Sequence, residues 1–226
     1  MTTILITGTG RGIGYALARA ALEKGWTVYG SARSTTAEGQ AELRAHANFR
    51  ALAFDVTDDA AVRAAAASVD APIDILVNNA GVIGDRAPVP TATDLDDFLQ
   101  TLAVNTVAPL RMVRAFLPHL KRSAHARVLT ISSFMGTLSV AHVNSISYRV
   151  SKAGVNKVMQ GLGIELAEAG IAVATVSPGW VRTDMGGDNA AVAPEDSASG
   201  ILKIAEELTL ATTGRFLNYD GAALAW

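Results

Sequence analysis

Near its start the chain reads Ile4-Leu5-Ile6-Thr7-Gly8-Thr9-Gly10-Arg11-Gly12-Ile13-Gly14, an apolar strand that runs into a glycine-rich turn and then a helix. Glycine at such a junction lets the backbone approach a pyrophosphate, whose charge is favoured by the free N–H groups and the dipole of the helix. Two common phosphate-binding patterns do not fit. A GxGxxG pattern from Gly8 would need glycine in place of Ile13, and a P-loop would need Gly-Lys followed by Ser or Thr. The stretch predicts a phosphate cradle, with a turn that binds nothing as the alternative.

Beyond this stretch, short apolar runs alternate with longer segments of helical period. We expect strands at residues 4–7, 27–31, 50–54, 73–78, 127–132, 171–177 and 215–219, and helices at residues 13–24, 37–47, 58–68, 95–117, 147–168 and 195–208. Repeated strand–helix alternation predicts a parallel sheet covered on both faces, because right-handed crossovers place each helix against the sheet. The fold class is therefore α/β, a doubly wound Rossmann-type sheet of about seven strands, in one domain spanning residues 1–226.

Composition excludes several classes of protein. The chain has 226 residues, of which 50% are hydrophobic, enough for one sizeable core. A net charge of -2, with no basic cluster longer than Lys121-Arg122, argues against a nucleic-acid partner. The chain has no cysteine, and its four histidines lack metal-ligand spacing, so we expect neither disulfides nor a metal site. The N-terminus lacks the features of a secretory signal and no apolar stretch is long enough to cross a bilayer, so we expect a soluble, cytoplasmic protein.

A tyrosine and a lysine stand four residues apart in Tyr148-Arg149-Val150-Ser151-Lys152. On a helix this spacing places both side chains on one face. A free tyrosine has a pKa of about 10, so a neighbouring cation is needed if the phenol is to exchange protons near neutrality. The pair is a candidate acid catalyst, and the alternative is a lysine whose stem packs along an aromatic ring.

Several motifs occur together in a fixed order along the chain. They are Thr7-Gly8-x-x-x-Gly12-x-Gly14, Asn78-Asn79-Ala80-Gly81, Asn105, Ser133, Tyr148-x-x-x-Lys152 and Pro178-Gly179. In this order they resemble the short-chain dehydrogenase/reductase family over nearly the whole chain. The pieces Pro178-Gly179-Trp180-Val181-Arg182-Thr183-Asp184-Met185 and Tyr219-Asp220-Gly221 resemble its small branch of C-signal and carbonyl-reducing members.

The resemblance implies four catalytic residues. Tyr148 is the proton donor in reduction, and Ser133 polarises the carbonyl. Lys152 holds the nicotinamide ribose and lowers the Tyr148 pKa, and Asn105 anchors a water through which Lys152 exchanges protons. Tyr148 follows Ser133 by fifteen residues, about two more than the family leads us to expect. Ser132 is therefore an alternative hydroxyl, although the register of Gly136 favours Ser133.

The end of the second expected strand predicts the cofactor. NAD-selective enzymes carry an acidic residue there, about 20 residues after the glycine loop. This chain has Ala32 followed by Arg33, and Arg11 in the glycine loop offers a second cation, so we expect NADP(H) to be preferred over NAD(H). Asp55 matches the position that accepts from the adenine amino group, or it caps the following helix. The other cofactor-binding positions that the resemblance implies are Gly8, Gly12, Ile13, Gly14, Val56, Asn79, Ala80, Gly81, Tyr148, Lys152, Pro178, Gly179, Val181 and Thr183.

The implied reaction is NADPH-dependent reduction of a small or medium aldehyde or ketone, reversible as alcohol oxidation. A short lid at residues 184–194 suggests an open site, to which Phe134, Met135 and Trp180 offer apolar contacts. Pairing through the helices around Asn105 and Tyr148 would give a homodimer or homotetramer. The alternative function is a cofactor-binding signalling or regulatory protein with little turnover.

Overall fold

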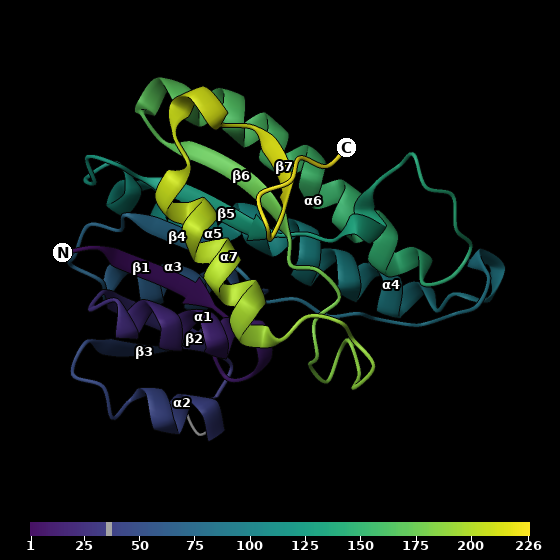
Figure 1. Ribbon diagram of the computed structural model, residues 1–226, viewed down its shortest axis with the longest axis horizontal. Coiled ribbons are helices and arrows are strands. Elements are labelled where there is room, and N and C mark those ends of the chain that lie inside the picture. Colours follow the sequence, from purple (N-terminus) through teal and green to yellow (C-terminus); the bar gives the residue numbers. More distant parts are fainter. Residues whose placement is uncertain (35–37) are drawn as a thin grey trace.

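The computed structural model describes residues 1–34 and 38–226 (Figure 1). Its parallel sheet has the strand order β3-β2-β1-β4-β5-β6-β7. The strands are β1 (Thr3–Thr7), β2 (Thr27–Ala32), β3 (Phe49–Ala53), β4 (Ile75–Asn78), β5 (Arg127–Ile131), β6 (Ala172–Ser177) and β7 (Arg215–Asn218). The order reverses at β1, which lies between β2 and β4, and ligands of such sheets bind beyond the carboxyl ends of the strands at this point.

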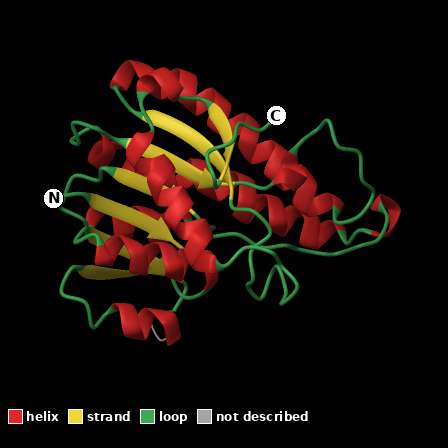
Figure 2. Ribbon diagram, viewed as in Figure 1, coloured by secondary structure: helices red, strands yellow, loops and turns green. Residues whose placement is uncertain are grey.

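Helices cover both faces of the sheet, as Figure 2 shows. The α-helices are α1 (Gly12–Glu23), α2 (Glu38–Leu43), α3 (Asp59–Ala67), α4 (Leu95–Leu102), α5 (Ala108–Leu120), α6 (Ile146–Glu165) and α7 (Pro194–Glu207). Helices α1 and α7 pack together on one face, and α3, α5 and α6 cover the other. Short 3-10 turns lie at η1 (Pro90–Ala92), η3 (Phe134–Gly136), η4 (Leu166–Ala169) and η5 (Leu210–Thr212), and η2 (Ala103–Val107) is a π-helical turn. The predicted doubly wound α/β fold is confirmed.

Alternation along the strands divides the core into two layers. On β1, Ile4 and Ile6 face the α1–α7 layer while Leu5 faces the opposite one, and all three are fully buried. Burial of such a side chain stabilises the fold by about 1.5–3 kcal/mol. Because both faces are covered, the strands read as continuous apolar runs.

Two predicted helices differ from the observed ones. For the helix expected at residues 37–47, residue 37 lies outside the described part of the chain and α2 ends at Leu43. The following residues form turns, in which the His46 N–H donates to Leu43 and the Phe49 N–H donates to His46. The helix expected at residues 95–117 runs from Leu95 to Leu120 but is interrupted by the π turn η2.

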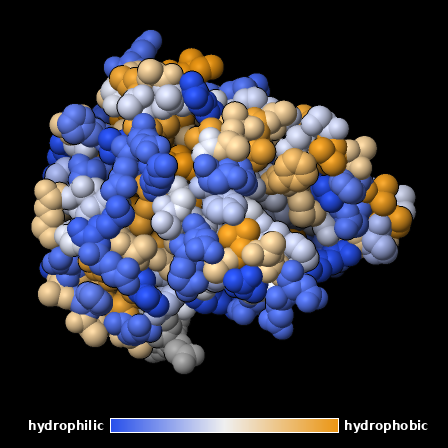
Figure 3. All heavy atoms as spheres, in the orientation of Figure 1, coloured by the Kyte–Doolittle hydropathy of each residue, from blue (hydrophilic) through white to orange (hydrophobic). Residues whose placement is uncertain are grey.

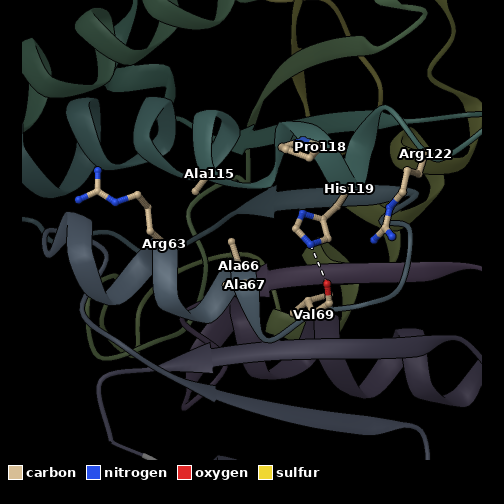
Figure 4. A pocket seen from close by; sticks show the side chains of 8 residues that line it. All are labelled: Arg63, Ala66, Ala67, Val69, Ala115, Pro118, His119 and Arg122. Atoms are coloured by element: carbon tan, nitrogen blue, oxygen red, sulfur yellow. Dashed lines mark hydrogen bonds between the residues drawn. The ribbon is translucent and has the colours of Figure 1, made fainter.

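A shallow groove of about 470 Å³ lies between α3 and α5 (Figure 4). His119 of α5 contacts the carbonyl oxygen of Val69 through Nε2 at 2.8 Å, and Arg111 of α5 lies 3.5 Å from Asp59 of α3. The groove is lined by Arg63, Ala66, Ala67, Val69, Ala115, Pro118, His119 and Arg122, which include none of the predicted site residues. These contacts therefore serve to join α3 to α5. Within the described residues, no helix has the length and apolar character needed to span a membrane.

Candidate active site

The glycine-rich turn lies between the end of β1 and the start of α1. Its backbone is tied to β2, because the N–H groups of Gly8 and Thr9 both donate to the carbonyl of Ser31. Gly12 has φ +56°, and a Cβ on Gly14 would lie 2.1 Å from the Gly8 carbonyl oxygen, so neither position accommodates a side chain. No side chain caps the N-terminus of α1, and its first turn has no acidic residue. This geometry suits an anion.

The motif after β4 packs against this turn. Asn79 donates through Nδ2 to the carbonyl of Thr7 at 2.8 Å, and the N–H groups of Asn79 and Ala80 donate to Thr7 Oγ1. A Cβ on Gly81 would lie 3.2 Å from Asn105 Oδ1 and 3.7 Å from Lys152 Nζ. The motif that contains Gly81 thus contacts both the glycine-rich turn and the predicted catalytic residues Asn105 and Lys152.

The two predicted phosphate-binding arginines have different surroundings. Arg11 Nη1 lies 2.8 Å from Asp184 Oδ2 in an ion pair whose side chains are 79% and 75% exposed. Such an exposed pair contributes about 0–1 kcal/mol, so an incoming phosphate would displace it easily. Arg33 is exposed and lies close enough to Asp55 to lower the pKa of that carboxyl. Arg11 follows β1 and Arg33 follows the neighbouring strand β2, so both lie at the carboxyl edge of the sheet.

Asp55 does not cap the helix that follows it. Asp58 caps α3 by accepting from the Ala61 N–H, whereas Asp55 Oδ1 accepts from the N–H and hydroxyl of Thr57. The hydrogen bonds from Thr57 are the main cause that lowers the pKa of Asp55, with a smaller contribution from Arg33. Of the two sequence interpretations of Asp55, helix capping is excluded, and an ionised carboxylate remains at this strand end.

Tyr148, Ser133 and Lys152 lie together where β5 meets α6. The Ser133 side chain lies close enough to the Tyr148 hydroxyl to lower its pKa, and Lys152 Nζ lies 5.5 Å from the centroid of the Tyr148 ring. Nζ donates to the carbonyl of Ile131 at 2.8 Å, which leaves two further N–H donors on the ammonium. The predicted helical face carrying Tyr148 and Lys152 is observed on α6.

Burial determines the protonation equilibria of this pair. Burial raises the pKa of Tyr148, and the hydrogen bond with Ser133 acts in the opposite direction. Burial lowers the pKa of Lys152 from 10.5 to about 8. The predicted lowering of the Tyr148 pKa by Lys152 is therefore not seen here, because burial outweighs any contribution from the nearby ammonium.

Asn105 lies in the π turn η2, where the N–H of Ala108 reaches the carbonyl of Ala103. Asn105 Nδ2 donates to the carbonyl of Val82 at 2.8 Å and to Ser151 Oγ at 2.9 Å, and its Oδ1 accepts from the Val82 N–H. The side-chain nitrogen and oxygen are thus both bonded, to the loop after β4 and to α6. Pro109 has no N–H to donate to the carbonyl of Asn105, which leaves this carbonyl without its usual α-helical donor.

The two neighbouring serines have different partners. Ser132 is 1% exposed and donates to Asn156 Oδ1 at 2.6 Å, away from Tyr148. Ser133 is half-buried and contacts Tyr148. A Cβ on Gly136 would lie 2.8 Å from the backbone of Lys152, so only glycine permits this close approach of η3 to α6. The register argument from Gly136 agrees with the placement of Ser133.

The segment after β6 closes one side of the site. Thr183 Oγ1 accepts from the Gly186 N–H, and Arg86 from the loop after β4 donates to the carbonyl of Met185 at 2.8 Å. Gly12 lies against Thr183, since an added Cβ would be 3.3 Å from its methyl group. Trp180 is 59% exposed and donates to the carbonyl of Gly186. The predicted lid thus contacts both the glycine turn and the loop after β4.

Pro178 and Gly179 begin this segment. The Pro178 carbonyl accepts from Ser197 of α7, and Gly179 has φ +82°. Val181 pairs with Val192 in an isolated bridge. Two other predicted cofactor-binding residues lie elsewhere in the chain. Ile13 packs on the α1–α7 core, and the Val56 carbonyl accepts from Arg111.

Four contacting residues were not predicted as part of the site: Asn156, Asp184, Arg86 and Ser151. Their partners lie between 24 and 173 residues away in the chain, apart from the local bond of Ser151 to Tyr148. Residues so far apart in the chain form no recognisable spacing pattern, so the sequence could not predict these contacts. Within the described residues, no group of three or more acidic, histidine or cysteine side chains forms a possible metal site.

The surface above the carboxyl ends of the strands mixes hydrophilic and hydrophobic residues, as the right-hand half of Figure 3 shows. Three exposed apolar side chains of loops at this edge are Phe134, Trp180 and Met185, which are 52%, 59% and 38% exposed. His142 and Asn144 lie in the exposed loop between η3 and α6, where Asn144 accepts from Arg149. Apolar contacts are therefore available to a bound molecule at this edge.

Known proteins resemble the chain in sequence and structure. Residues 2–192 match the family described as short chain dehydrogenase. The C-signal protein of Myxococcus xanthus is 36% identical over 156 residues, which make up 69% of this chain and 93% of that protein. Among solved structures, NADPH-bound carbonyl reductase from chicken fatty liver is 32% identical, with a TM-score of 0.93 over 100% of this chain and 99% of that one. The carbonyl reductase Sniffer of D. melanogaster is 31% identical, with a TM-score of 0.95 over 100% of both chains.

Proposed function

The chain belongs to the short-chain dehydrogenase family of oxidoreductases, and from this premise we propose that it reduces small or medium aldehydes and ketones with NADPH. The observation that carries the proposal is the meeting of Ser133, Tyr148 and Lys152 beside the glycine turn. The NADPH-bound carbonyl reductase from chicken is similar over the full length of the chain and supports the same reaction class.

Hydride addition to a carbonyl leaves negative charge on its oxygen, which the protein must neutralise with a proton and hydrogen-bond donors. Tyr148 donates the proton, and the hydroxyl of Ser133 donates a hydrogen bond to the same oxygen. The Lys152 ammonium stabilises the phenolate that Tyr148 becomes. The carbonyl of Asn105, which lacks a donor from Pro109, holds a water that returns a proton to Lys152.

The residues at the strand ends fit a dinucleotide with a 2'-phosphate. The uncapped start of α1 receives the pyrophosphate, and Arg11 and Arg33 receive the 2'-phosphate. Ala32 removes the carboxylate that would repel this phosphate. When bound, the nicotinamide cofactor supplies the hydride. Lys152 keeps two N–H donors for the ribose hydroxyls while it remains bound to the carbonyl of Ile131.

The substrate class follows from the surroundings of Tyr148. The lid is short, and two of the nearby apolar side chains, Phe134 and Trp180, are more than half exposed. An open site of this kind offers few contacts that would exclude related carbonyl compounds. We therefore expect activity with several simple aldehydes and ketones rather than with one bulky substrate.

A screen of carbonyl compounds with NADPH oxidation as the readout tests the proposal. We expect turnover of several substrates, and loss of about 10²–10⁴-fold in kcat for Tyr148→Phe, because the general acid is removed. Tyr15→Phe removes a phenol whose hydroxyl is bonded to Glu42 of α2 rather than to any predicted site residue, and serves as the matched control. Full turnover by Tyr148→Phe would refute Tyr148 as the proton donor. Tight NADPH binding without turnover of any carbonyl compound would refute the proposed reaction.

The proposal includes a homo-oligomer formed through the helices around the site. Apolar side chains on α4, η2 and α6 are exposed, among them Leu95 at 73%, Leu99 at 65%, Val107 at 47% and Ile164 at 76%. A second copy of the chain would cover such side chains. Light scattering should give a dimer or tetramer, and replacing Leu95 and Leu99 by Lys should yield monomers.

A further inference from the structure

Asn156 lies one helical turn beyond Lys152 on the same face of α6. Its Oδ1 accepts from Ser132 Oγ at 2.6 Å, and the two residues are 3% and 1% exposed. Ser132 separates Ile131, whose carbonyl accepts from Lys152, from Ser133, whose side chain contacts Tyr148. Three consecutive residues at the end of β5 thus each lie beside one of three α6 residues spaced four apart, and two of these pairs are hydrogen-bonded.

The position of Ser132 determines that of its neighbour. The Ser132 N–H donates to the carbonyl of Val176 at 2.8 Å, so the backbone is fixed by the sheet while the side chain is fixed by Asn156. Consecutive Cα atoms are about 3.8 Å apart across a trans peptide. Any displacement of Ser132 is therefore passed on to the hydroxyl of Ser133.

Packing alone does not account for Asn156. Its Nδ2 is buried and has no hydrogen-bond partner among the described residues, and the same holds for Oδ1 of Asn78. An unsatisfied buried polar atom costs about 1–3 kcal/mol, so apolar side chains at both positions 132 and 156 would be more stable. What the asparagine provides, and an apolar residue does not, is a fixed direction for the Ser132 hydroxyl.

We propose that Asn156 and Ser132 are positioning residues of the active site, whose hydrogen bond sets the end of β5 on α6 and so holds Ser133 against Tyr148. The inference rests on the proposed function. Neither side chain touches substrate or cofactor; both act through Ser133.

A double-mutant cycle on kcat tests this dependence. Ser132→Ala should lower kcat about tenfold with little change in KM, because misplacement of a catalytic group affects the transition state more than ground-state binding. In a Ser133→Ala background the same replacement should lower kcat less than twofold. Equal losses in both backgrounds would show that Ser132 does not act through Ser133, and would overturn the inference.

Thr130 supplies the matched control. It lies on β5 two residues before Ser132 and on the same face, is 1% exposed, and accepts from Asn78 Nδ2 at 3.1 Å. Thr130→Val removes a buried hydroxyl, as Ser132→Ala does, but two residues further from the site. The kcat of Thr130→Val should change less than twofold even if its urea midpoint falls as much as that of Ser132→Ala. A tenfold loss of kcat in Thr130→Val would mean that general loosening of the core is the cause.

Asn156→Leu separates positioning from stability. The replacement removes an unsatisfied amide nitrogen but leaves the Ser132 hydroxyl without its acceptor, so the two effects offset and the urea midpoint should change little while kcat falls about tenfold. Unchanged kcat in this variant would overturn the inference. Failure of the proposed function has a different outcome, since the wild type would then turn over no carbonyl compound, or Ser133→Ala would leave turnover intact.

Discussion

The ammonium of Lys152 is buried without a counter-charge. The residue is 5% exposed, its pKa falls from 10.5 to about 8 because of burial, and no acidic side chain of the described residues forms an ion pair with it. Replacing it by methionine keeps the unbranched stem and removes the charge. Lys152→Met should therefore abolish turnover and change the pH dependence of stability.

The magnitude follows from the two pKa values. The ordinary value of 10.5 exceeds the value of about 8 by about 2.5, and at about 1.4 kcal/mol for each pKa unit the charge costs the folded state about 3 kcal/mol. Below pH 8 the lysine is charged in the folded and unfolded states, and the cost is present in full. Above pH 10.5 it is neutral in both states and the cost disappears. The stability of the wild type should rise relative to the variant between these values.

Urea unfolding of both proteins without cofactor at pH 7 and pH 10.5 measures this difference. Other groups titrate alike in the two proteins, and the lost hydrogen bond to Ile131 contributes an offset that does not depend on pH. We expect the unfolding free energy of Lys152→Met minus that of the wild type to fall by about 3 kcal/mol from pH 7 to pH 10.5. Lys157→Met, an exposed lysine on the same helix, should show no such change.

The result that refutes this reasoning is a constant difference between wild type and Lys152→Met across the whole range. Such a result would mean that the ammonium is solvated or paired in solution. A difference that changes in the opposite direction would mean that the pKa of Lys152 is raised on folding.

Three further predictions concern the cofactor side. Ala32→Asp should shift preference toward NADH by about tenfold or more, measured as the ratio of kcat/KM for the two cofactors, because its carboxylate repels a 2'-phosphate; equal or better use of NADPH would contradict this. Asp184→Asn should free Arg11 and tighten NADPH binding by up to about fivefold, with no change for NADH, in a fluorescence titration where Asp188→Asn is the control; equal effects on both cofactors would refute it. Gly14→Ala should lower stability by about 1–3 kcal/mol and abolish cofactor binding, because its Cβ would lie 2.1 Å from the Gly8 carbonyl. Gly161→Ala, with nothing within 4 Å, should instead gain about 0.5–1 kcal/mol, and similar urea midpoints for the two variants would contradict the steric argument.

Local patterns predicted the sheet and its helices because each element carries its own signal. The glycine turn and the apolar strand before it identified the first unit, and alternation with helical segments identified the rest. The strand order around β1 has no local signal, because it depends on which crossovers pass over which face. The shortened helix α2 shows that helical composition extends past the point where the backbone turns toward β3.

The site was predicted where residues lie close in the sequence. Tyr148 and Lys152 share a helix face, and Ser133 could be placed by the register of Gly136. The partner of Ser132 could not, because Asn156 reads as an ordinary polar helix residue until its burial is known. The ion pair of Arg11 with Asp184 spans 173 residues and leaves no pattern in the sequence. In the long helix, no pattern predicted the π turn that forms at Ala103–Val107.

That π turn gives the helix from Leu95 to Leu120 one residue more than a regular helix of the same path would need. Each α-helical residue rotates the chain by about 100°, so the surplus residue turns everything after it by about a quarter of a circle. Deleting one residue would restore regular geometry, but either Asn105 would leave Val82 or the buried face around Phe116 would turn outward. Substitutions should therefore be tolerated here more readily than any change in length.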